Sequence, residues 1–88
     1  MKLIEIKDIQ YEETAVYYRQ KYEGIAVFDF EQAGGINEVP IFFVVEINPL
    51  GEKKVLIEFK KNVHYPLIPL LRQLRARIVT MKEDGSLF

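Results

Sequence analysis

Hydrophobic and polar residues alternate over most of the first sixty positions, which is the period of β-strands. The segment 41–47 (IFFVVEI) is the strongest example, because it is dense in β-branched and aromatic residues. The stretch 48–51 (NPLG) follows directly and predicts a hairpin turn, since Pro presets φ and Gly accepts a positive φ. We expect strands in four segments: Lys2–Ile9, Ile25–Phe30, Ile41–Ile47 and Lys53–Lys60.

Two segments between these strands are less regular. Gln32–Pro40 is predicted to be a loop, because Gly34-Gly35 is flexible and Pro40 marks a strand edge. Tyr11–Glu23 fits either a strand or a helix, and we favour the strand because tyrosines and β-branched residues crowd its centre. The helix stays open as the alternative, since it would place four residues on one stripe: Tyr11, Ala15, Tyr18 and Tyr22.

After Lys61 the hydrophobic residues recur at helical spacing: Leu67, Leu70, Leu71, Leu74, Ile78 and Met81. Pro66 and Pro69 fit only near a first turn, so the helix is expected to begin between Tyr65 and Pro69. Two ends remain open, one near Ala76 with residues 77–81 as a short strand, and one at Met81.

These elements predict one α+β domain over residues 1–88, an antiparallel meander of four to five strands with a C-terminal helix packed on one face. A small curled β-barrel with a terminal helix is the alternative. Both faces of the predicted sheet are apolar, since Phe42 and Val44 lie opposite Phe43 and Val45. One helix covers only one face, so we expect sheet curling, a helical Tyr11–Glu23 or another chain to cover the second.

That second face leads to the primary functional hypothesis, a small non-enzymatic protein-interaction module that acts as a homodimer or as a subunit of a complex. Tyrosine is enriched at protein interfaces because its ring packs while its hydroxyl finds a partner. The candidate interface residues are therefore the aromatic and apolar ones expected on the sheet: Tyr17, Tyr18, Phe42 and Val44.

Charge is unevenly distributed along the 88 residues. Residues 1–52 hold four basic and ten acidic side chains, a net charge of −6, whereas residues 53–88 hold eight basic and three acidic ones, a net charge of +5. The two halves can pair within the fold or across a dimer. The alternative is a basic face that binds nucleic acid or a phosphate ligand, formed by Lys60, Lys61, Arg72, Arg75 and Arg77.

Candidate chemistry is sparse. The chain has no cysteine, which excludes disulfides and thiolate chemistry, and His64 is its only histidine. The acids predicted within strands are more typical of a solvated sheet face than of catalysis: Glu5, Asp29, Glu46 and Glu58. We therefore predict no catalytic residue, metal or cofactor, and a subunit of an enzyme without identifiable catalytic residues is the third hypothesis. Without a long apolar run, the expected location is the cytoplasm and no membrane partner is expected.

Overall fold

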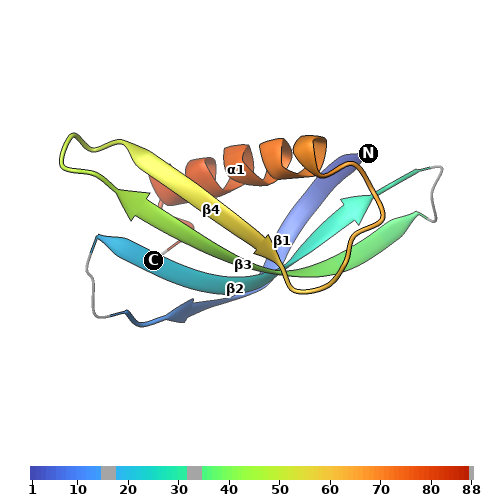
Figure 1. Ribbon diagram of the computed structural model, residues 1–88, viewed down its shortest axis with the longest axis horizontal. Helices are drawn as coiled ribbons and strands as arrows, with labels where there is room; N and C mark the ends of the chain where they lie inside the picture. Colours follow the sequence, from blue (N-terminus) through green and yellow to red (C-terminus); the bar gives the residue numbers. More distant parts are fainter. Residues whose placement is uncertain (15–17, 32–34, 88) are drawn as a thin grey trace.

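The computed structural model describes residues 1–14, 18–31 and 35–87, which form four strands and one helix (Figure 1). Each strand pairs antiparallel with the next, in the order β1-β2-β3-β4. The α+β meander with a C-terminal helix is confirmed, and the barrel alternative is wrong because β1 and β4 are not neighbours in the sheet. The elements are β1 (Lys2–Glu12), β2 (Arg19–Asp29), β3 (Ile36–Ile47), β4 (Lys53–Phe59) and α1 (Leu67–Glu83).

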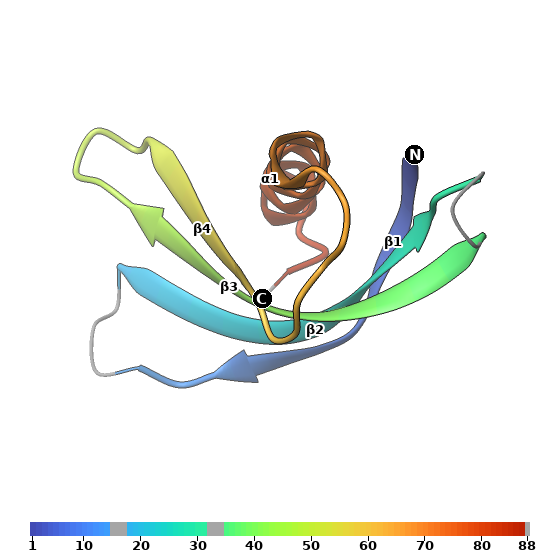
Figure 2. The same ribbon diagram turned by 45° about the vertical axis from the view of Figure 1, so that its right-hand side comes forward.

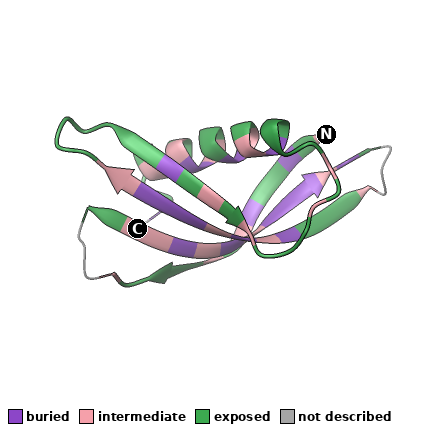
Figure 3. Cartoon of the chain, viewed as in Figure 1, coloured by how far each residue is buried: buried purple, intermediate pink, exposed green. Residues whose placement is uncertain are grey.

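The sheet curls around the helix, so that β4 and the first half of β1 rise on opposite sides of α1 (Figure 2). We call the face that contacts α1 the inner face and the opposite face the outer face. The hydrophobic core lies between the inner face and the helix, where buried positions alternate with exposed ones along the strands (Figure 3). Its most deeply buried side chains include Phe28, Ile41, Phe43, Leu70, Leu74 and Ile78.

The segment Tyr11–Glu23 contributes to two strands wherever the structure describes it. Tyr11 and Glu12 end β1, and they pair with Tyr22 and Lys21 of β2. The helix alternative is therefore wrong for these residues and the favoured strand is confirmed. Tyr22 shows why the strand prevails, because its ring stacks on Phe43 at a centroid distance of 5.0 Å and is buried in the core.

The loop predicted for Gln32–Pro40 is wrong over Ile36–Pro40, which forms the first part of β3. Pro40 thus lies inside a strand, at a place where its missing N–H has little cost. Its carbonyl accepts the Lys60 N–H at 3.0 Å, and β4 ends one residue before Lys60. The pyrrolidine nitrogen therefore faces the end of β4, where the edge of β3 is open, rather than a continuing ladder.

The helix begins at Leu67, as predicted, with Pro66 as its N-cap and Pro69 in its first turn, where the backbone N–H groups have no intrahelical acceptor. It ends at Glu83, so the expected ends at Ala76 and Met81 are both wrong, as is the short strand at 77–81. Burial explains the extra length, because Ile78 continues the buried stripe begun by Leu70 and Leu74 and packs into the core.

Candidate functional site

The outer face carries Phe42 and Val44, two of the four residues predicted for an interface. They occupy alternate positions of β3, so the structure places them side by side. Val44 is only 9% exposed and Phe42 is half-buried. The Lys60 ammonium lies over the Phe42 ring, 4.5 Å from its centroid, and donates to Glu23 at 2.6 Å. Charged side chains of the same chain therefore cover much of this apolar patch.

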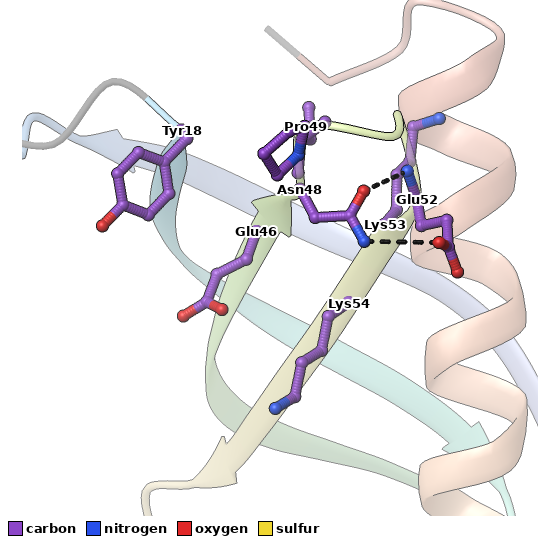
Figure 4. Close-up of a pocket in the computed structure, with 8 residues that line it drawn as sticks. Tyr18, Glu46, Asn48, Pro49, Glu52, Lys53 and Lys54 are labelled. Carbon is purple, nitrogen blue, oxygen red and sulfur yellow. Dashed lines mark hydrogen bonds between the residues drawn. The ribbon is translucent and has the colours of Figure 1, made fainter.

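Tyr17 lies outside the described residues, and Tyr18 lies just before β2. The Tyr18 side chain is 53% exposed and lines an open cavity of about 830 Å³ beside the β3–β4 turn (Figure 4). Its carbonyl accepts the Ile47 N–H at 3.0 Å, which fixes the end of β2 against the end of β3. The predicted interface residues are thus divided between the outer face and this cavity.

The cavity beside the turn is lined by residues of mixed charge. Asn48 shapes the turn because its side-chain oxygen accepts the N–H groups of Leu50 and Glu52, and Gly51 takes the positive φ of 83°. This arrangement confirms the turn predicted for residues 48–51. The described lining includes no hydrogen-bonded pair of a nucleophile and a base, and it comprises Tyr18, Glu46, Ile47, Asn48, Pro49, Glu52, Lys53 and Lys54.

The basic residues predicted for a phosphate-binding face do not share one surface. Lys60 lies on the outer face, where it pairs with Glu23. Arg77 and Arg75 lie on opposite flanks of α1, because Arg77 donates to carbonyls of β1 and Arg75 to a carbonyl of β4. Arg72 and Lys61 are exposed. Binding of nucleic acid therefore remains a prediction from the sequence, without a common surface to support it.

The uneven charge along the chain is partly balanced within the fold. The Lys60–Glu23 ion pair joins the basic second half to the acidic first half at 2.6 Å. Two further ion pairs of the described chain, Lys7–Glu38 and Arg19–Glu46, lie within the first half. These pairs involve partly exposed side chains, so each contributes little stability.

The remaining candidate residues for chemistry are dispersed. His64 is exposed on the connection to α1, as expected, and the strand-borne acids Glu5, Glu46 and Glu58 lie on the outer face. Asp29 ends β2 and accepts the Glu31 N–H at 2.8 Å. Across the described ranges, no three His, Cys, Asp or Glu side chains are grouped so that they could hold a metal.

The last turn of α1 carries the most deeply placed polar contact. Lys82 donates to the Tyr22 hydroxyl at 3.3 Å. Burial raises the pKa of Tyr22, with a smaller contribution from Tyr11, and burial lowers the pKa of Lys82, with a smaller contribution from Lys53. Both shifts favour the neutral forms, so this contact fastens the helix to β2 without a fixed charge pair.

The two edges of the sheet differ in regularity, and β1 forms the irregular one. Its register shifts between Leu3 and Glu5 and again between Lys7 and Gln10. The helix also bonds to this edge, since Arg77 donates to the Leu3 carbonyl at 3.3 Å and Gln73 accepts the Leu3 N–H at 2.8 Å. Bulges and occupied main-chain groups are the means by which proteins protect an edge from pairing.

The other edge, β4, is regular. Its pairing with β3 has no register shift, and the hydrogen bonds of Asn48 and Lys60 to the opposite strand fix which main-chain groups face inward. The odd-numbered residues of β4 therefore direct their N–H and C=O groups away from the sheet: Lys53, Val55, Ile57 and Phe59. Within the described chain, only one of these groups has a partner, the Val55 carbonyl, which accepts the Arg75 Nε–H at 3.3 Å.

An apolar groove runs beside the β4 edge. Its volume is about 510 Å³, and it separates Ile57 and Phe59 from the first turns of α1. Leu67 lines it and is 46% exposed, and Leu56 on the strand itself is 37% exposed. The sequence analysis missed this surface because a strand pattern does not reveal which strand lies at an edge.

The fold and this surface define the class of the protein, an α+β protein with an open, curled antiparallel sheet and one regular exposed edge. The model of the BB_0187 family matches residues 1–83, and the chain therefore belongs to this family. No curated protein and no solved structure gives a significant match to the chain. The helix in the described part of the chain lacks the length and apolar character needed to cross a membrane.

Proposed function

We propose that this protein is a small non-enzymatic interaction module that binds another polypeptide by strand addition at the β4 edge. It acts in this way as a homodimer or as a subunit of a complex. The observation that carries the proposal is the contrast between the edges, because β4 directs regular main-chain groups outward whereas β1 is bulged and bonded to the helix. In strand addition, main-chain hydrogen bonds supply affinity and alternate side chains supply specificity.

The groove beside β4 supports the proposal. An added strand places every second side chain on the inner face, next to Ile57 and Phe59 and in front of Leu67. Burial of these apolar surfaces stabilises the complex beyond its main-chain hydrogen bonds. The non-enzymatic part rests on the dispersed chemistry of the described residues, where His64 has no hydrogen-bonded carboxylate partner.

The experiment adds a strand-forming probe to the whole protein, a lysine-flanked peptide of alternating threonine and valine, and follows amide hydrogen exchange by NMR. We expect the outward amides of Ile57 and Phe59 to exchange more slowly as the peptide is added at millimolar concentration. Ile57→Pro removes an outward N–H and no β3–β4 hydrogen bond, so it should abolish this protection at Phe59.

Ile57→Ala is the matched control, since it shortens the same side chain and keeps the N–H. Its Phe59 amide should still be protected by the peptide. Circular dichroism establishes that both variants keep the fold. Unchanged exchange at Ile57 and Phe59 in the unsubstituted protein, or equal behaviour of the two variants, would contradict strand addition at this edge.

A further inference from the structure

The outer-face residues of β4 and its flanks carry an antisymmetric charge pattern. Read along the chain the pattern is acidic, basic, leucine, acidic, basic, from Glu52, Lys54, Leu56, Glu58 and Lys60. An antiparallel copy centred on Leu56 reverses the order, so that every acid meets a base. We propose that the strand added at the β4 edge is β4 of a second copy of this chain, with Leu56 opposite Leu56. This inference rests on the strand addition proposed above.

The main chain permits this register. Only the odd-numbered residues of β4 face outward, so an antiparallel partner must place odd residues opposite odd residues. Centring on Leu56 places Val55 opposite Ile57 of the second copy, and Lys53 opposite Phe59. These form hydrogen-bonded pairs, and Leu56 lies on the two-fold axis as a pair without mutual main-chain hydrogen bonds.

Charge selects this register over its neighbours. Centring on Leu56 places Lys54 opposite Glu58 of the second copy and Glu52 opposite Lys60, and symmetry repeats both pairs. Sliding the strands to centre on Val55 places Glu52 opposite Glu58. Centring on Ile57 instead places Lys54 opposite Lys60. Both neighbouring registers bring like charges together, which is unfavourable across strands, and neither forms an opposite pair among these residues.

The apolar surfaces agree with a second copy as the occupant. Leu56, 37% exposed on the outer face, becomes covered by its own symmetry mate. On the inner face, Val55 of the second copy lies opposite Ile57, which lines the groove in front of Leu67. The two sheets become one, and the bulged β1 strands lie at its far ends. Those edges do not pair further, so the assembly closes as a dimer.

Cysteine cross-linking tests the register, because the chain contains no cysteine of its own. Leu56→Cys places two sulfurs on the two-fold axis, with Cα atoms about 4.5 Å apart, within the range that a disulfide spans. Glu58→Cys, on the same face and strand, places its Cα atoms roughly 14 Å apart, since four residues separate them along the strand. We expect mild oxidation to give a covalent dimer for Leu56→Cys and not for Glu58→Cys.

The opposite preference, equal cross-linking of both variants, or no covalent dimer from Leu56→Cys overturns the proposal. The two proposals can fail separately. If the peptide protects the Ile57 and Phe59 amides but Leu56→Cys does not cross-link, strand addition stands and self-pairing is wrong. If the amides stay unprotected as well, both are wrong.

A charge exchange provides an independent test by sedimentation equilibrium. Lys54→Glu turns two opposite pairs of the dimer into like pairs, and should weaken dimerisation roughly ten- to a hundredfold. Adding Glu58→Lys to the same chain exchanges both members of each pair and should restore the dimer. Lys61→Glu, an exposed lysine beyond the strand, changes the net charge equally and should leave dimerisation within about threefold of the unsubstituted chain. A double variant as weak as Lys54→Glu alone overturns the register.

Discussion

Arg75 controls access to the β4 edge, which leads to an unusual expectation for Arg75→Ala. The Arg75 Nε–H donates to the Val55 carbonyl at 3.3 Å in the single chain. In the proposed dimer that carbonyl accepts the Ile57 N–H of the second copy instead, so two Arg75 bonds must break when a dimer forms. Arg75→Ala removes a net contribution of about 0.5–1.5 kcal/mol from the single chain, toward the lower end because the side chain is exposed.

The same substitution should strengthen association, since the dimer no longer has to break those two bonds. The gain is about 1–3 kcal/mol, on the order of a five- to a hundredfold lower dissociation constant. Urea denaturation at low concentration measures the first effect, and sedimentation equilibrium measures the second. Arg72→Ala is the control, because Arg72 is exposed on the same helix and has no hydrogen-bond partner in the described chain. Association weakened by Arg75→Ala, or changed equally by Arg72→Ala, would refute the reasoning.

Contacts of the helix set three further expectations. Gln73→Ala leaves the buried Leu3 N–H without its acceptor and should lower the free energy of unfolding by about 1–3 kcal/mol in urea denaturation; no loss would contradict this role. Leu74→Ala empties a fully buried position and should cost about 2–5 kcal/mol in the same assay. A cost below that of Gln73→Ala would count against this core. Hydrogen bonds from Ser86 hold the pKa of Asp84 below 3.8. This depressed pKa stabilises the fold above the unfolded pKa, and the stabilisation disappears as pH falls through the folded pKa. The difference in melting temperature between the unsubstituted chain and Asp84→Ala should therefore shrink toward pH of about 2, and a constant difference would exclude the effect.

Local patterns in the sequence predicted most of the fold. The alternation in residues 41–47 and the turn at 48–51 were sufficient for the β3–β4 hairpin, and the two prolines located the start of α1. The end of the helix was not predictable in this way. Ile78, Val79 and Thr80 are β-branched and weaken helix propensity locally, but burial of Ile78 in the core outweighs that preference.

Features that depend on which strands are neighbours were not predictable from the sequence. Pro40 has a small cost only because β4 ends beside it, and this requires knowledge of the register. Phe42 and Val44 gave the expectation of an uncovered apolar face. The stem of Lys60 covers Phe42, which becomes visible only when β3 and the end of β4 are paired.

The charge pattern of the candidate site is different, because it is written in the sequence. Glu52, Lys54, Leu56, Glu58 and Lys60 alternate with the strand period and are antisymmetric about the leucine. This pattern has no consequence in a central strand, whose neighbours are both fixed within the chain. It predicts self-pairing only because β4 is an edge of the sheet, and only the strand order establishes that.

The most direct measurement is isotope-filtered NMR on an equal mixture of labelled and unlabelled protein at millimolar concentration. It detects nuclear Overhauser effects only between different copies of the chain. We expect contacts between the Leu56 methyl groups of the two copies, and between Val55 of one copy and Ile57 of the other. Contacts between copies that arise instead from Phe42 and Val44, or none at all, would contradict association through the β4 edge.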